Sequence, residues 1–125
     1  EKMTLVADIG KINNRLVTDG QIYGGLAQGI GLALWEDYED IQKHSTLKGA
    51  GFPYCEQIPD DMDIIYVENS RPEGPFGAAG VGELPLTSPH AAVINAIRNA
   101  CGVCIKRLPA LPEKVLAGLQ ARVRP

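Results

Sequence analysis

One carboxylate stands out in the sequence because of the residues around it. Glu83 follows a run of small residues, G-A-A-G-V-G at 77–82, and precedes the apolar stretch L-P-L at 84–86. Glycines permit turns that other residues avoid and alanines leave space, so this run can carry Glu83 to a fixed point beside a bulky group. Apolar neighbours would partly desolvate the carboxylate and make it a better proton acceptor near neutral pH. The alternative is a solvated Glu83, or one paired with an arginine.

The other polar motifs give weaker signals. The run at 77–82 lacks the Gly-Lys-Ser/Thr ending of a phosphate loop, and its glycine order differs from G-x-G-x-x-G. Cys101 and Cys104 have the C-x-x-C spacing, but His44 and His90 are not placed to complete a zinc site. A redox dithiol is the open alternative. We predict that the two cysteines are small residues at the end of a helix.

Two helices are expected to position these residues. The first is predicted from Gly20 to about Asp37 with Asp19 as its N-cap, because apolar residues recur there at three- and four-residue steps. Several glycines inside it predict close packing against a neighbouring segment. Ser88-Pro89 is typical of a helix start and Gly102 of a helix end, which predicts a second helix over 89–101. The expected apolar faces are Tyr23, Leu26, Ala27, Ile30, Leu34 and Trp35 in the first helix, and Ala92, Val93, Ala96, Ile97 and Ala100 in the second.

Strands and loops fill the rest of the chain. Strands are predicted over 3–9 and 62–68, with a further short one at 103–108. Turn-forming residues predict loops over 10–19, 38–60 and 69–82. A last helix should open at Leu111-Pro112-Glu113 and bury Val115, Leu116 and Leu119. Together these elements predict an α+β fold: two main helices, a terminal helix and a few strands.

Composition narrows the class of protein. The 125 residues are 45% hydrophobic, which fits one small domain or a piece of a larger one. A net charge of −3 argues against nucleic acid or an anionic membrane as the partner. No apolar run approaches the ~20 residues of a membrane span, and three cysteines make a poor disulfide framework. We therefore expect a soluble, cytoplasmic protein, and Glu1 at the start indicates a truncated or processed segment.

Two segments carry a resemblance to a known family. Residues 19–31, D-G-Q-I-Y-G-G-L-A-Q-G-I-G, and 74–92, G-P-F-G-A-A-G-V-G-E-L-P-L-T-S-P-H-A-A, resemble the C-terminal part of the molybdenum-binding subunit of the xanthine oxidase family, the molybdenum hydroxylases. Within that family the chain is most similar to bacterial aldehyde oxidoreductases. The resemblance runs from Val6 to about Leu119 and implies that residues 1–125 form the C-terminal portion of a molybdenum cofactor-binding domain. The implied cofactor is molybdopterin with molybdenum, as the cytosine dinucleotide.

The same resemblance implies roles for individual residues. Glu83 becomes the base that takes a proton from a hydroxyl on molybdenum, whose water-derived oxygen attacks an aldehyde carbon. Gln21 lies beside the molybdenum oxo group, where a helix N-terminus would favour it, and Gln28 is a second candidate. Gly80 and Gly82 are expected to line the pterin or substrate pocket, and none of these residues is a metal ligand.

The resemblance also implies partners and leaves alternatives open. The family's catalytic unit is several times longer and receives electrons through iron–sulfur clusters held by four cysteines each, which this chain cannot supply. We therefore expect the remaining segments of the molybdenum-binding subunit and an iron–sulfur domain as partners, with no activity in this segment alone. The alternatives are a non-catalytic module that binds a partner or a small anion, and a family member that hydroxylates N-heterocycles.

Overall fold

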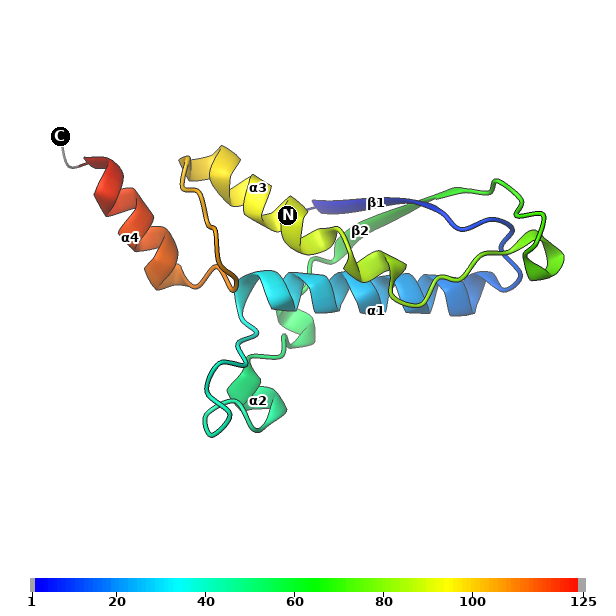
Figure 1. Cartoon of the computed structure of the whole chain (residues 1–125). Coiled ribbons are helices and arrows are strands. Elements are labelled where there is room, and N and C mark those ends of the chain that lie inside the picture. The colour runs from blue at the N-terminus through cyan, green and yellow to red at the C-terminus, as the bar shows by residue number, and fades with distance from the viewer. Residues whose placement is uncertain (1, 124–125) are drawn as a thin grey trace.

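A computed structural model describes residues 2–123 of the chain, which fold around one long helix (Figure 1). In chain order the main elements are strand β1 (Lys2–Asp8), helix α1 (Arg15–Leu34), strand β2 (Asp61–Val67), helix α3 (Pro89–Cys101) and helix α4 (Pro112–Val123). Shorter turns lie between them: helix α2 (Leu47–Ala50) and the 3₁₀ turns η1 (Cys55–Gln57), η2 (Pro75–Gly77) and η3 (Leu84–Leu86). The predicted α+β class is confirmed, with two strands in the sheet.

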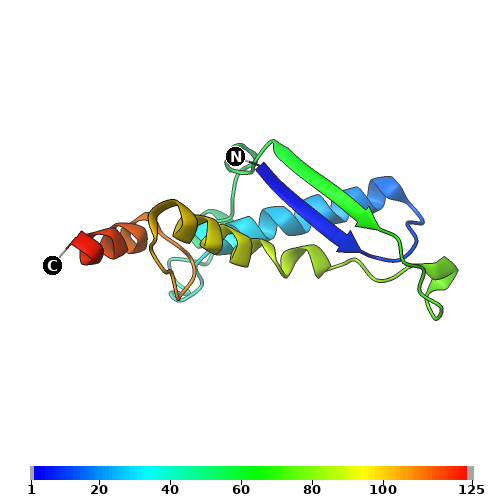
Figure 2. The same ribbon diagram turned by 90° about the horizontal axis from the view of Figure 1, so that it is seen from above.

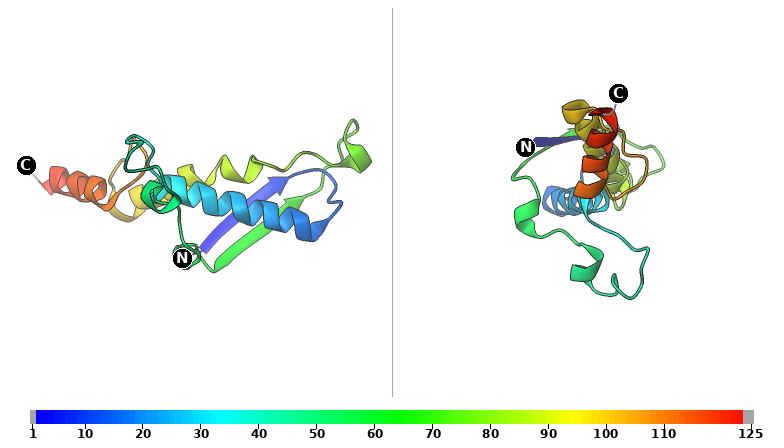
Figure 3. Two further views of the ribbon diagram at one scale, coloured as in Figure 1. Left: turned by 90° about the horizontal axis from the view of Figure 1, so that it is seen from below. Right: turned by 90° about the vertical axis from the view of Figure 1, so that its left-hand side faces the viewer.

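Helix α1 separates two parts of the molecule. The sheet and α3 lie on one side of it and the α2 segment on the other, while α4 projects away at one end (Figures 1 and 3). The two strands are parallel and in register from Lys2↔Asp61 to Asp8↔Val67. Parallel neighbours need a long crossover connection, which α1 and the segment after it supply. No described helix is long and apolar enough to cross a membrane.

The core lies between the sheet and α1. Side chains on a strand alternate between its two faces, so every second residue of β1 points toward the helix, and Leu5 and Ala7 are buried there. Ile22 and Leu26, one turn apart on α1, meet them from below and are almost completely buried. Partly buried residues close the cluster: Met3, Ile12, Met62, Ile64, Tyr66, Val81 and Leu84.

Helix α1 begins earlier and ends earlier than the sequence pattern predicted. Its first residue is Arg15 instead of Gly20, because the Asn14 side chain caps the helix by accepting a hydrogen bond from the Val17 N–H at 3.1 Å. Asp19, predicted as the cap, lies inside the helix, which ends at Leu34 rather than near Asp37. The pattern predicts a loop at Asn13 and Asn14, whereas Asn14 is the N-cap of the helix.

Asp19 ties the start of α1 to β2. It accepts a hydrogen bond from the Tyr66 hydroxyl at 2.5 Å and pairs with the Arg15 guanidinium at 2.8 Å. The Arg15 guanidinium also lies over the Tyr66 ring, 4.3 Å from its centroid. The hydrogen bond from Tyr66 and the nearby Arg15 lower the pKa of Asp19 below its ordinary value of 3.8. Burial and the same bond raise the pKa of Tyr66 to about 12.

These shifts predict how stability depends on pH. Because the carboxyl pKa is lower in the folded chain, Asp19 stabilises the fold above pH 3.8, and that contribution is lost as the pH falls through the folded value. We expect Asp19→Asn to lower the thermal unfolding midpoint at pH 7, and the gap to wild type to narrow as the pH falls below 3.8. Asp60→Asn, at an exposed position, is the matched control. A gap that persists unchanged in acid would contradict this role for Asp19.

Other predicted buried positions are exposed in the described chain. Tyr23 is 40% exposed, and Leu116 and Leu119 on α4 are 55% and 38% exposed. On α1 the predicted Leu26 and Ile30 are buried, and Ile22, which the pattern left out, is buried with them. Residues 103–108 form no strand, although Val103 is buried against Gly118 of α4. The loops over 38–60 and 69–82 agree with the prediction apart from the short turns α2, η1 and η2 inside them, and the bounds of α3 agree fully.

Glycines on α1 allow the following segments to pack closely, as predicted. A methyl group at Gly25 would collide with the Pro85 ring, and one at Gly29 would come within 2.7 Å of Pro89. Pro85 and Pro89 are themselves fully buried. Ser88 and Gly102 occupy the predicted ends of α3, but the Ser88 side chain makes no capping hydrogen bond. This packing fixes η3, and therefore the residue just before it, against α1.

Candidate functional site

Helix α1 and the loop before η3 bring three of the predicted site residues together. The Gln21 side-chain amide donates a hydrogen bond to the carbonyl oxygen of Gly82 at 3.0 Å, across 61 positions of sequence. Glu83 follows directly and is the N-cap residue of η3, whose Pro85 rests on Gly25. The structure thus brings Gln21 and Glu83 to one junction between two segments, which buried packing holds together.

A hollow of about 250 Å³ opens at this junction. Three of its glycines have open space where a side chain would stand, since a Cβ at Gly20, Gly24 or Gly82 would meet no heavy atom within 4 Å. Gly80 has similar open space but does not line the hollow. The lining residues are Gly20, Gln21, Gly24, Gly25, Gln28, Gly82, Glu83 and Leu86.

Sequence reasoning found only part of this set. Gln21, Gly24, Gly25 and Gln28 follow the i, i+3, i+4, i+7 spacing of one helix face, which in retrospect is a usable signal. Because this face is polar and rich in glycine, the apolar periodicity of the helix does not indicate it. Gly24 was expected to pack against a neighbour like the other helix glycines, whereas it faces the hollow.

The surroundings of Glu83 differ from the expectation. Its carboxylate is exposed in the described chain, so the predicted desolvation is absent there. Val81 and Leu84, the apolar neighbours expected to cover it, turn inward and pack on the core. No ion pair joins Glu83 to an arginine among the described residues. The carboxylate is held at the edge of the hollow and is free to meet a ligand.

The helix dipole does not position Gln21, in contrast to the expectation from the sequence. Because α1 begins at Arg15, Gln21 lies in the second turn of the helix, and the helix-dipole effect fades within the first turn. The amide is positioned by the Gly82 carbonyl instead. A glutamine amide has two N–H donors, and this bond uses one of them. The second remains available to a ligand in the hollow.

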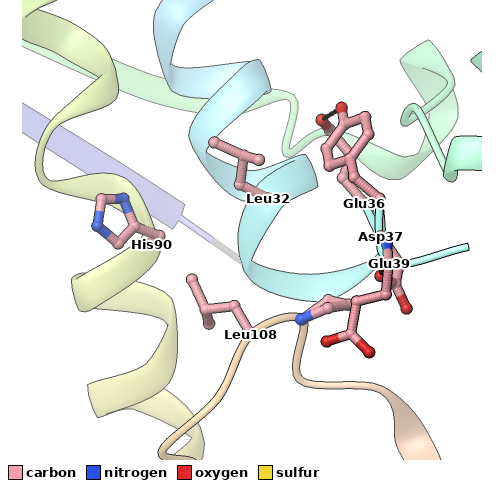
Figure 4. Close-up of a pocket in the computed structure, with 8 residues that line it drawn as sticks. Leu32, Glu36, Asp37, Glu39, His90 and Leu108 are labelled. Atoms are coloured by element: carbon pink, nitrogen blue, oxygen red, sulfur yellow. Dashed lines mark hydrogen bonds between the residues drawn. The ribbon is translucent and has the colours of Figure 1, made fainter. Parts of the chain in front are cut away.

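A larger hollow of about 450 Å³ lies near the other end of α1 (Figure 4). Glu36 there is 4% exposed, and its carboxylate accepts a hydrogen bond from the Tyr38 hydroxyl at 2.5 Å, which together with burial raises the pKa of Tyr38 to about 12. His90 lies across the hollow, and its Nδ1 has no partner among the described residues. Glu36 Oε1, which lies against Gly31, also has no hydrogen-bond partner among the described residues.

Metal-binding clusters are missing from the described part of the chain. Residues 2–123 contain no group of three or more histidine, cysteine, aspartate or glutamate side chains able to hold a metal ion. Cys55, Cys101 and Cys104 are free thiols, and the Cys101 thiol donates a hydrogen bond to the Ile97 carbonyl within α3. Any metal at the Glu83 hollow would therefore need ligands from outside this set, such as a cofactor.

Comparison with known proteins indicates which cofactor this could be. Residues 1–59 match the family model of a molybdopterin cofactor-binding domain. The aldehyde oxidoreductase of Megalodesulfovibrio gigas is 72% identical over 119 residues, which are 95% of this chain and 13% of that protein. A putative xanthine dehydrogenase molybdenum-binding subunit of Escherichia coli is 33% identical over 91% of this chain and 16% of its own length.

Solved structures agree in fold. The aldehyde oxidoreductase of Desulfovibrio desulfuricans superimposes with a TM-score of 0.92 at 69% identity, over 94% of this chain and 13% of that chain. The present chain thus spans about one seventh of the length of the relatives that it matches. Together, the cofactor-binding match, the high identity over almost the whole chain and the shared fold show that the chain belongs to the xanthine oxidase family of molybdenum hydroxylases.

Proposed function

We propose that residues 1–125 form the C-terminal portion of the molybdenum cofactor-binding domain of an enzyme that oxidises aldehydes to carboxylic acids, with Glu83 as its general base. The observation that carries the proposal is the hydrogen bond from Gln21 to Gly82, which sets an amide donor and a free carboxylate on one glycine-lined hollow. That arrangement suits a site where one group holds a ligand and the other takes a proton. The relative that is 72% identical, an aldehyde oxidoreductase, supports the substrate class.

The residues of the hollow fit the molybdenum cofactor. Bare glycine backbone at Gly20, Gly24 and Gly82 leaves room for a bulky group, and the unused Gln21 N–H is a neutral donor for an electron-rich oxygen. Gln21 and the backbone of Gly82 would hold the cofactor, and Gly80 would line its approach. The bound cofactor supplies the two-electron redox chemistry and positions the attacking oxygen.

Glu83 would serve the overall reaction RCHO + H₂O → RCOO⁻ + 3H⁺ + 2e⁻. Its carboxylate accepts the proton of the attacking oxygen, and the exposed edge of the hollow lets that proton leave to water afterwards. The two electrons leave through iron–sulfur clusters held outside this chain. We further propose that the molybdopterin is present as the cytosine dinucleotide. The partners of this chain are the rest of the molybdenum-binding subunit and an iron–sulfur domain. A cytoplasmic location is consistent with the three free thiols.

Hydroxylation of an N-heterocycle is the second candidate function. The xanthine dehydrogenase subunit among the relatives supports it, since xanthine is an N-heterocycle, but that relative is only 33% identical. A purely non-catalytic module fits less well, because it leaves the polar hollow and the cofactor-binding match without a purpose.

Isotope labelling tests the proposed reaction. The enzyme that carries this chain should contain molybdenum and pterin, and in H₂¹⁸O each carboxylate should gain one ¹⁸O atom by turnover, with a second wherever the aldehyde carbonyl has first exchanged with the labelled water. Mass spectrometry of the product measures this directly, and the same reaction in ¹⁸O₂ with ordinary water is the control. Label that comes from O₂, or faster turnover of N-heterocycles than of every aldehyde tested, would contradict the proposal.

A further inference from the structure

The loop that carries Glu83 is fixed at both of its ends. It leads from η2, which lies beyond the C-terminal ends of both strands, back to η3 (Figure 2). At its first end the Ala79 N–H donates a hydrogen bond to the Ile9 carbonyl at 2.9 Å. At its second end the buried Pro85 of η3 packs against α1. Residues 80–82, which we call the strap, therefore connect two fixed points of the fold.

Backbone contacts hold the first of these points. Gly10 and Ala78 form an antiparallel bridge, and a Cβ at Gly10 would collide with the Gly77 carbonyl oxygen. That oxygen accepts hydrogen bonds from the N–H groups of Lys11 and Arg71, both at 2.9 Å. The two backbones are thus too close for a side chain to separate them, and the strap begins at a defined place.

Between its ends the strap is held loosely. Gly80 and Gly82 have open space around them, since a Cβ at either position would meet no heavy atom within 4 Å. Glycine also has more backbone freedom than any other residue. Val81 packs its side chain on the core, but a glycine on each side leaves the neighbouring peptide groups free to turn. Among the described residues, the strap takes part in one hydrogen bond, which the Gln21 amide donates to the Gly82 carbonyl.

That hydrogen bond, the Gln21 tether, acts on the peptide group next to Glu83. The Gly82 carbonyl and the Glu83 N–H belong to one planar unit, so holding the oxygen restrains the plane from which the Glu83 side chain departs. Because the Glu83 side chain is exposed, its place depends on its backbone more than on surrounding side chains. Gln21 belongs to a helix of 20 residues, which gives the tether a rigid base.

We propose that Gln21 is a positioning residue for Glu83, because its amide holds the strap and so keeps the carboxylate within reach of a ligand in the hollow. This proposal rests on the proposed function, since it takes Glu83 to be the base. It gives Gln21 a second task beside its contact with the cofactor. A catalytic group that is displaced by about 1 Å can cost about 10²-fold in rate, so a single tether at this point matters.

A methionine at position 21 removes the tether in the intact enzyme. Methionine is unbranched and about as long as glutamine, but it has no N–H donor. Gln21→Met should lower kcat per bound molybdenum by about two- to tenfold, the range for the loss of one hydrogen bond. The KM for the aldehyde should change little, because the strap acts on the chemical step. An unchanged kcat would overturn the proposal.

Stiffening the strap separates the tether from a contact between Gln21 and the ligand. Gly80→Ala restricts the strap without entering the hollow, because Gly80 does not line it and a Cβ there meets open space. The effect of Gly80→Ala on kcat should be more favourable in the Gln21→Met background than in wild type, by about two- to fivefold. Comparing the two backgrounds cancels whatever Gly80→Ala does by itself. Additive effects of the two substitutions would overturn the positioning role.

Gln28 provides the matched control. It lines the same hollow from the same helix, but it makes no hydrogen bond to the strap among the described residues. Gln28→Met therefore removes an amide from the hollow and leaves the tether intact. Gly80→Ala should have the same effect on kcat in the Gln28→Met background as in wild type. Equal rescue of Gln21→Met and Gln28→Met would overturn the assignment to Gln21.

Crystal structures of the molybdenum-loaded variants give a result that does not depend on turnover. In Gln21→Met, residues 80–83 should be displaced or lose ordered density while α1 and η3 superimpose on wild type, whereas Gln28→Met should leave the strap in place. An unmoved strap in Gln21→Met, together with an inactive Glu83→Gln enzyme, would overturn the positioning role alone. A displaced strap together with a fully active Glu83→Gln enzyme would instead overturn the proposed function, and with it the base that Gln21 positions.

Discussion

Enzyme carrying Glu83→Gln should oxidise aldehydes about 10²–10⁴-fold more slowly than wild type while it keeps its full content of molybdenum and pterin. Glutamine has nearly the shape of glutamate, and the Glu83 side chain is exposed and unpaired among the described residues, so the exchange disturbs no packing. What it removes is the ability to accept a proton. Steady-state kcat, with molybdenum measured by mass spectrometry on the same sample, gives the result.

A nearby glutamate supplies the control for this variant. Glu73 is exposed in the loop after β2 and does not line the hollow, so Glu73→Gln should leave kcat unchanged. Glu83→Asp keeps the negative charge and the basic carboxylate but withdraws them by one methylene. It therefore tests whether the position of the base matters. We expect its activity to lie between glutamine and wild type. Full activity of Glu83→Gln would remove this residue from the mechanism and leave the hollow as a binding site alone.

Adjacent glycines on α1 should respond in opposite ways to the same added methyl group. A Cβ at Gly25 would collide with the buried Pro85 ring and stand 3.2 Å from the Leu86 backbone nitrogen, and neither group can rotate away. We expect Gly25→Ala to destabilise the fold by about 1–3 kcal/mol, the usual range for overpacking. Since Pro85 belongs to η3, the same change should push Glu83 from its place and lower kcat.

Gly24→Ala is the internal comparison. Its methyl group would meet no atom within 4 Å, and alanine is favoured over glycine inside a helix by about 0.5–1 kcal/mol, so the unfolding midpoint should rise slightly. Because that methyl enters the hollow, we expect molybdenum content to fall even as the chain becomes more stable. Calorimetry and metal analysis of both variants test this contrast. Equal stability of the two would mean that η3 does not press on α1 as the structure has it.

The sequence predicted elements well where one local rule decides them. The bounds of α3 follow from proline at its start and the left-handed Gly102 at its end, and both strands lie within one residue of their predicted spans. The start of α1 was missed because Asn13-Asn14 satisfies a loop rule and a capping rule equally, and only the hydrogen bond from Val17 decides between them. The prediction of burial on α3, where Ala92, Ala96 and Ala100 are exposed, and on α4 was wrong for a different reason. An apolar pattern predicts that a helix face will be covered, but it does not identify the segment that covers it.

The site was predicted by resemblance more than by physics. Gln21 and Glu83 are 62 positions apart, and no periodicity relates a helix residue to a loop residue at that distance. The close approach depends on Gly25 and Pro85 packing together, a long-range event that each residue's own preferences do not encode. The sequence neighbours of Glu83 predicted an apolar surrounding for its carboxylate. This prediction was wrong for the described chain, because Val81 and Leu84 pack into the core instead.

Helix α1 connects the Gln21 hollow with the buried Ile30. Gln21 and Ile30 lie nine positions apart on this one rigid element, an axial separation of about 14 Å. A shift of the helix caused at its far end would therefore be transmitted as a rigid-body movement to Gln21. Thermodynamic linkage then requires reciprocity: a contact near Ile30 that changes the affinity for a ligand at Gln21 must itself be strengthened or weakened by that ligand by the same factor.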